Sequence, residues 1–146
     1  MTTPTYETDD DRRREDGIAA TLSAAWRCDV RRQPQYAPVD FHIEEEAAVT
    51  GLAELKCRDN PRFAYRDVWF ALAKHDALRA EALVRGLPPD RCLFVVSWDD
   101  ALGWVTVPAC AELSPVWRRR SSRPEHTAEL VLLVPVVWFT LVMERE

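Results

Sequence analysis

The sequence predicts a mixed α/β domain in which helices flank a central sheet and further strands follow toward the C-terminal end. Two segments carry apolar residues at helical spacing, and the segments between and after them alternate or run continuously apolar, as strands do. The chain has 146 residues, of which 47% are hydrophobic and 29% charged. Because this size and composition suit one globular domain, we expect residues 1–146 to form a single unit.

The first helix is expected over residues 11–26. Ile18, Leu22 and Trp26 recur there at helical spacing, and acidic residues occupy the first turn, where the helix dipole favours them. Glu15 precedes Ile18 by three residues and lies on the same side of the helix. We therefore expect Glu15 at the margin of the buried face.

Three strands are expected next. Residues 28–32 form a short strand, and residues 39–43 and 51–57 alternate apolar and polar side chains, which is typical of half-buried strands. The last two strands are expected to form a hairpin that turns near Ala47, with the three glutamates 44–46 in the turn or, alternatively, at a separate metal site. A symmetric register would pair Phe41 with Ala53, Val39 with Leu55, and Asp40 with Glu54.

A second helix is expected over residues 66–85, ending at Gly86. Residues 92–96 are continuously apolar, which indicates a central strand covered on both faces. Residues 104–107 are expected to be its antiparallel neighbour. The order is then helix, three strands, helix, strand, with a β extension over about residues 108–146.

The most hydrophobic stretch, residues 130–142, is shorter than the roughly 20 residues that a membrane-spanning helix needs. It contains Pro135, which belongs at the edge of a sheet or at a bulge because it lacks an N–H donor. We expect one bent strand or two short ones. This segment either packs on the main sheet or forms a homodimer interface.

The hairpin register places two carboxylates and an ammonium group on one face of the sheet. Asp40 and Glu54 would lie about 5 Å apart, and Lys56 follows Glu54 on the same face. The chain has only two lysines among 19 basic residues, so Lys56 stands out. Carboxylates suit Mg²⁺ or Mn²⁺, and an ammonium group can orient or activate water, which together permit phosphodiester hydrolysis.

These residues resemble the PD-(D/E)xK nuclease superfamily, whose core has the order αβββαβ. Asp40 takes the place of the first acid, and Glu54-Leu55-Lys56 resembles the second acid and the lysine. The resemblance covers about residues 9–107 and is strongest to small phage-encoded members and to Holliday-junction resolvases. It implies a restriction-endonuclease-like fold with a mixed central sheet, DNA as the substrate, and a metal bound by Asp40, Glu54, the carbonyl of Leu55 and Glu15. The residue directly before Asp40 is Val39 rather than proline, which departs from the motif.

Three more residues are candidates for binding substrate. Lys74 lies in the second helix, where it either contacts a phosphate or packs its stem on the sheet. Arg58 follows the motif in a group of arginines that forms a basic face or a solvated surface. His42 lies on the same strand face as Asp40 and contacts substrate or is simply exposed.

A second group of arginines comprises Arg118, Arg119, Arg120 and Arg123. Trp117 beside it either stacks on a base or is merely a surface residue. The four cysteines show no Cys-x-x-Cys spacing, and together with the charged N-terminus they indicate reduced thiols in the cytoplasm, or in the host cytoplasm if a phage encodes the chain. No spacing of His and Cys predicts a zinc site.

The sequence thus predicts a Mg²⁺- or Mn²⁺-dependent DNA nuclease. The net charge of −5 favours one alternative, a catalytically inactive module on the same fold that binds nucleic acid or a protein partner. Neither alternative involves a membrane.

Overall fold

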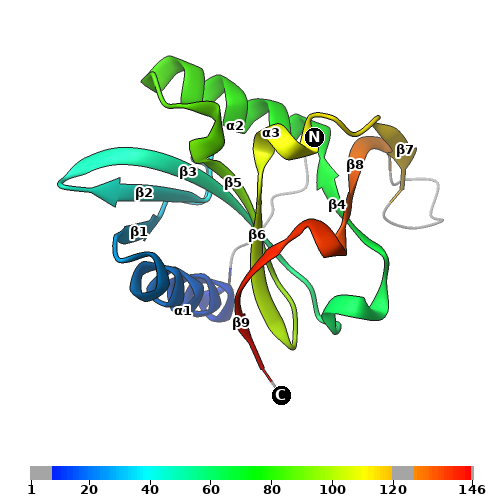
Figure 1. Ribbon diagram of the computed structural model, residues 1–146, viewed down its shortest axis with the longest axis horizontal. Helices are drawn as coiled ribbons and strands as arrows, with labels where there is room; N and C mark the ends of the chain where they lie inside the picture. The colour runs from blue at the N-terminus through cyan, green and yellow to red at the C-terminus, as the bar shows by residue number, and fades with distance from the viewer. Residues whose placement is uncertain (1–7, 120–126, 146) are drawn as a thin grey trace.

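The computed structural model describes residues 8–119 and 127–145. Figure 1 shows a central sheet with helix α1 on one face and helix α2 and a smaller sheet on the other. The helices are α1 (Asp9–Trp26), α2 (Leu72–Arg85) and α3 (Val107–Cys110), with 3-10 turns η1 (Arg62–Ala64), η2 (Pro89–Arg91) and η3 (Val136–Trp138). The strands are β1 (Asp29–Arg32), β2 (Phe41–Glu45), β3 (Ala48–Cys57), β4 (Asp67–Ala71), β5 (Cys92–Ser97), β6 (Ala101–Thr106), β7 (Val116–Arg118), β8 (Glu129–Pro135) and β9 (Thr140–Glu144).

The central sheet is mixed, with the strand order β1-β2-β3-β5-β6-β9. Strands β3 and β5 are parallel, whereas the other neighbours are antiparallel. Strand β5 is covered on both faces as predicted, since Phe94 and Val96 pack toward α2 and Val95 packs toward α1. The predicted order of helix, three strands, helix and strand is therefore confirmed, with one additional strand inserted.

Helix α1 begins at Asp9, two residues before its predicted start. The side-chain oxygen of Thr8 accepts a hydrogen bond from the N–H of Asp11, and the Asp11 carboxylate accepts one from the N–H of Thr8, which completes a capping box. Ile18 and Leu22 are buried against the sheet, as the helical spacing predicted. The helix ends at Arg27, whose backbone is left-handed.

The hairpin of β2 and β3 carries a bulge that the sequence did not reveal. Its two-residue turn is Glu46-Ala47, and Glu44 and Glu45 belong to β2 rather than to the turn. With this turn and no bulge, Phe41 would face Leu52 instead of its predicted partner Ala53. The register shifts between Ile43 and Glu44 and leaves Thr50 without a partner, which restores the predicted pairing of Phe41 with Ala53.

The predicted pairing of Val39 with Leu55 is wrong. Strand β2 begins only at Phe41, and Val39 packs in the cluster on the opposite face from Leu55. The chain bends before Phe41, and the main-chain carbonyl of Asp40 accepts a hydrogen bond from Gln33 there. This bend places Asp40 beside the hairpin rather than within the strand ladder.

The second helix was predicted too long. Its first part forms strand β4, in which Val68 and Phe70 are buried, and α2 begins only at Leu72. Strand β4 pairs with β8, so its hydrogen-bonding partner lies far along the chain and leaves no local signal. The end of the helix at Gly86 is as predicted, since this glycine has a φ of 68°.

The C-terminal segment forms two strands in different sheets. Strand β8 is the central strand of the three-stranded sheet β4-β8-β7, and β9 adds to the main sheet beside β6. Pro135 is the last residue of β8, which suits a residue without an N–H donor. The predicted packing on the main sheet is thus confirmed for β9.

Strand β6 begins at Ala101, three residues before its predicted start. Gly103 therefore lies within the strand, where a Cβ atom would come within 3.1 Å of the Thr140 carbonyl oxygen. The glycine therefore permits the close approach of β9 at the bulge between Leu102 and Gly103.

Candidate active site

The two predicted acids meet at the start of the hairpin. The main-chain N–H of Leu55 donates a hydrogen bond of 2.8 Å to Oδ2 of Asp40. The Asp40 carboxyl group thereby lies next to Glu54, and its charge is, after burial, the largest cause of the raised pKa of Glu54. The predicted convergence of these two carboxyl groups is therefore present in the structure.

Glu54 is one of the few charged side chains buried in the described part of the chain, with 8% of its surface exposed. Burial, followed by the negative charge of Asp40, raises the pKa of Glu54 from its usual 4.5 to about 8. This value includes the opposing effect of the neighbouring Lys74, so at neutral pH Glu54 is protonated in the metal-free protein. Strongly shifted carboxyl groups of this kind concentrate at functional sites.

Lys74 supplies a cation to this pair. Its Nζ atom lies 3.7 Å from Oε1 of Glu54, and its charge lowers the pKa of Glu54 against the stronger effect of burial. The Lys74 side chain is 59% exposed, so its ammonium group also remains accessible to solvent. Helix α2 thus places a cation beside Glu54, whereas the predicted contact of Lys74 with a phosphate stays a prediction.

Lys56 lies on the same face as Glu54 and is held by the inserted strand. Its Nζ atom donates a hydrogen bond of 2.6 Å to the main-chain carbonyl oxygen of Trp69 in β4. The side chains of Leu55 and Cys57 point to the opposite face, toward α1. The alternation predicted for this strand is confirmed.

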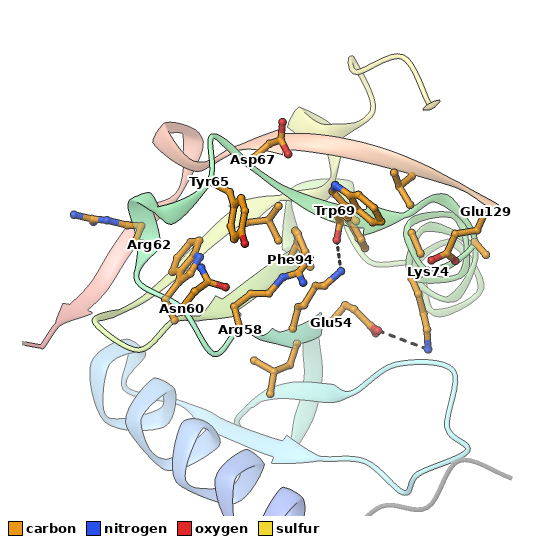
Figure 2. Close-up of a pocket in the computed structure, with 18 residues that line it drawn as sticks. Glu54, Arg58, Asn60, Arg62, Tyr65, Asp67, Trp69, Lys74, Phe94 and Glu129 are labelled. Atoms are coloured by element: carbon orange, nitrogen blue, oxygen red, sulfur yellow. Dashed lines mark hydrogen bonds and ion pairs between the residues drawn. The ribbon is translucent and has the colours of Figure 1, made fainter. Parts of the chain in front are cut away.

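Glu54, Lys56 and Lys74 line a cavity of about 770 Å³ between the central sheet, α2 and the smaller sheet. Figure 2 shows Lys74 at one end of this cavity, Arg58 near its centre, and Asn60, Arg62 and Tyr65 at the other end. Its walls include four polar or aromatic residues that the sequence did not single out, Tyr65, Asp67, Trp69 and Glu129. Asp67 and Trp69 belong to β4 and Glu129 to β8, so the pairing of these two distant strands brings three of the four to the cavity.

The other predicted site residues lie in different places. Arg58 lines the cavity, as its proposed role requires. His42 lies near Arg85 at the far end of α2, and burial together with that positive charge lowers the pKa of His42. Glu15 belongs to α1, which covers the opposite face of the sheet, and its negative charge acts on the thiol of Cys57 and contributes to raising the pKa of Cys57.

Within residues 8–119 and 127–145, no group of three or more Asp, Glu, His or Cys side chains is arranged to hold a metal ion. The acids that the structure brings together are Asp40 and Glu54, and the structure does not place Glu15 with them. The residue set is therefore a pair of carboxylates with two lysines, rather than a closed metal cage.

Several other expectations concern the surface. Trp117 is 65% exposed, and Arg118 and Arg119 beside it are also exposed, whereas Arg120 and Arg123 lie outside the described residues. The four cysteines are free, as predicted, and burial raises the pKa of Cys110 to about 12. Among the helices of the described residues, none combines the length and the apolar character needed to cross a membrane.

Comparison with known proteins agrees with the architecture. Residues 1–142 match the family described as "Phage putative PDDEXK endonuclease". The structure is similar to that of Hjc from Archaeoglobus fulgidus, a Holliday junction resolvase from an archaeal hyperthermophile, with a TM-score of 0.59 and 12% sequence identity. The similarity covers 91% of this chain and 92% of Hjc. A comparison with curated proteins gave no match.

The fold and the paired acids place this chain in the class of restriction-endonuclease-like proteins. The chain belongs to the phage PDDEXK endonuclease family, which confirms the predicted superfamily and fold class. The match also includes most of the C-terminal extension, which the sequence resemblance had left unassigned.

Proposed function

We propose that this protein is a Mg²⁺- or Mn²⁺-dependent DNA nuclease whose active site consists of Asp40, Glu54 and Lys56. The hydrogen bond from Leu55 to Asp40 sets the Asp40 carboxyl group beside Glu54, on the strand face that also carries Lys56, and this arrangement is the observation on which the proposal rests. Membership of an endonuclease family supports the reaction class. DNA as the substrate agrees with the resolvase activity named for Hjc.

The paired acids fit a divalent cation. Carboxylate oxygens are the ligands that Mg²⁺ and Mn²⁺ prefer, and a bound ion would stabilise the negative charges of the buried Glu54 and the half-buried Asp40. Asp40, Glu54 and the main-chain carbonyl of Leu55 would hold it. A bound divalent ion would supply Lewis acidity toward the scissile phosphate.

Lys56 is placed to act on the attacking water. Its ammonium group is fixed by the carbonyl of Trp69 and projects from the same face as Glu54, two residues further along the strand. A lysine ammonium can donate to a water molecule and to a phosphate oxygen, and its pKa is adjustable by its surroundings. We assign to Lys56 the orientation of water for in-line attack at phosphorus.

Lys74 and Arg58 would contact the substrate. Both line the same cavity as Lys56, and Figure 2 shows Lys74 at one end of it and Arg58 nearer its centre, so their positive charges extend along its length. Cations in such a row suit successive phosphates of a nucleic-acid strand. His42 lies near Arg85 at the far end of α2, so it would contact a bound strand only at the periphery of the site.

A cleavage assay tests this function. Purified protein is incubated with supercoiled, linear single-stranded and branched DNA in Mg²⁺, in Mn²⁺ and in EDTA, beside the variants Asp40→Asn and Asp29→Asn. Asp29 is an exposed carboxylate on β1, so its variant is a matched control. We expect metal-dependent cleavage that Asp40→Asn reduces by at least about 100-fold and Asp29→Asn leaves unchanged.

If no DNA is cleaved with either metal, the alternative of a catalytically inactive binding module gains support. Calorimetry then distinguishes the two directly, because a binding module needs no affinity for Mg²⁺ or Mn²⁺. The same titration tests Glu15, which remains a predicted ligand through the family resemblance. A loss of affinity in Glu15→Gln as large as that in Glu54→Gln would make it a third acidic ligand, and unchanged affinity would exclude it.

A further inference from the structure

Two aromatic side chains are exposed beside the cavity. Phe63 is 65% exposed and Tyr65 is 69% exposed, and with Arg66 and Val137 they line a second hollow of about 380 Å³ between η1 and η3. We call these four residues the aromatic ledge. We propose that the ledge binds unpaired bases next to the scissile phosphate, so that the enzyme's substrate is DNA with a single-stranded or unpaired segment.

The ledge is continuous with the proposed active site. Tyr65 lines both the second hollow and the cavity that contains Glu54 and Lys56. In Figure 2, Tyr65 lies at the end of the cavity that is distant from Lys74 and close to Arg58 and Asn60. A strand whose phosphates follow the row of cations would therefore reach the ledge within a few nucleotides of the site of attack.

The Phe63 ring packs against a fixed arginine. The guanidinium group of Arg62 lies 4.3 Å from the centre of the Phe63 ring, and its Nη2 atom lies 3.6 Å from Oε1 of Glu144. The main-chain N–H of Arg62 donates to Asp100 at 2.7 Å. Because these contacts fix η1, little side-chain entropy would be lost when a base stacks on the exposed part of the Phe63 ring.

The chemistry of the ledge favours unpaired nucleotides over other occupants. Exposed aromatic rings beside arginines can stack on bases while the cations contact phosphates. In a duplex the faces of the bases are already stacked on each other, so the rings can reach only bases that are unpaired or turned out of the helix. Arg66 is exposed and adds a positive charge to the ledge. This charge suits a phosphate of a nucleic acid, whereas an apolar protein surface would gain nothing from it.

Binding measurements test the ledge separately from cleavage. Fluorescence anisotropy in EDTA compares a labelled 12-nucleotide single strand with the same strand in a duplex, for wild type, Phe63→Ala, Tyr65→Ala and the double variant. Tyr36→Ala is the matched control, because Tyr36 is 86% exposed and lies in the connection between β1 and β2. Each ledge variant should weaken single-strand binding by about 5- to 100-fold and change duplex binding much less.

Two further experiments locate the contact. Phe63→Trp, which keeps an aromatic ring, should retain single-strand binding, whereas Phe63→Leu should not. A single strand that carries 5-iodouracil should crosslink to Phe63 or Tyr65 under ultraviolet light, as peptide mass spectrometry would show. Circular dichroism melts of every variant confirm that the protein is folded.

This inference rests on the proposed nuclease function, but the two fail in different ways. Unchanged single-strand binding in the double variant, or an equal loss of duplex binding, overturns the ledge even if Asp40-dependent cleavage is observed. Ledge-dependent binding without any metal-dependent cleavage overturns the nuclease and supports the ledge. A halved molecular mass of Phe63→Ala in sedimentation, with normal DNA binding, would show that a second copy covers the rings and would overturn the proposal.

Discussion

The main-chain N–H of Leu55 donates a 2.8 Å hydrogen bond to the carboxylate of Asp40, which fixes the first acid beside the second. The donor lies between Glu54 and Lys56, so one backbone group sets the position of Asp40 relative to both of its proposed partners. The bulge at Thr50 sets the register that makes this contact. The site therefore depends on hairpin geometry as much as on residue identity.

Glu54 makes the stability of the metal-free protein depend on pH. Its pKa is raised from 4.5 to about 8, so between these values the folded protein holds a proton that the unfolded chain has released. The contribution of Glu54 to stability is thus complete below about pH 4.5 and is lost as the pH rises through about 8. Glu54→Gln should remove this decline, a difference on the order of 2 kcal/mol or more at alkaline pH.

Urea unfolding of wild type and Glu54→Gln in EDTA, at acid and alkaline pH, measures this effect. Saturating Mg²⁺ should reverse the trend in the wild type, because the metal binds the deprotonated pair. Parallel pH dependences of the two proteins would show that Glu54 is not the group responsible.

Lys56 should not be replaceable by arginine. A guanidinium group keeps the charge but cannot give up its proton, and it is longer and planar, so a bond from it to the Trp69 carbonyl would place its charge differently from Nζ. We expect Lys56→Arg to lower the rate of cleavage by at least about 100-fold. Single-turnover rates beside Arg79→Lys, which makes the reverse change at an exposed position of α2 outside the cavity, provide the control. Full activity of Lys56→Arg would limit Lys56 to a purely electrostatic role.

Lys74 should set the pH range in which metal binds. Its ammonium group lowers the pKa of Glu54, so its removal in Lys74→Met should raise that pKa further. Protons would then compete with Mn²⁺ for Glu54 up to a higher pH. In calorimetric titrations, the affinity for Mn²⁺ should therefore increase at a higher pH in Lys74→Met than in the wild type. Lys74→Arg retains the charge and should behave as the wild type. An unchanged profile in Lys74→Met would mean that the ion pair does not form in solution.

The hairpin turn offers a stability test that is independent of the chemistry. Glu46 and Ala47 have φ values of 51° and 62°, which are costly for residues with a Cβ atom. Ala47→Gly should therefore stabilise the protein by about 1 kcal/mol. The same substitution at Ala80, an exposed position of α2, should destabilise it by about 1 kcal/mol. Thermal melts of both variants compare the two signs, and a loss of stability in Ala47→Gly would contradict the turn geometry.

Local patterns were enough to predict the hairpin and its acids. Period-two alternation placed Glu54 and Lys56 on one face, and the pairing of Phe41 with Ala53 followed from an assumed turn centred on Ala47. The true turn lies half a residue earlier, and the bulge at Thr50 compensates for the difference. The correct register thus came from a turn that was placed incorrectly.

The part of the site that could not be predicted depends on distant strand pairing. Residues 66–71 were assigned to a helix, although Val68 and Phe70 alternate with polar or half-buried neighbours. Only the pairing with β8 makes this segment a strand, and that pairing supplies the Trp69 carbonyl that holds Lys56. The predicted role of Glu15 came from resemblance alone, and the packing of α1 on the opposite face explains why the structure does not place it with the pair.

Anomalous diffraction from a crystal soaked in Mn²⁺ tests the proposed active site most directly. We predict a manganese peak between the carboxylates of Asp40 and Glu54 that disappears in Asp40→Asn crystals. A peak elsewhere on the protein, with none between these two residues, would show that they do not form the metal site.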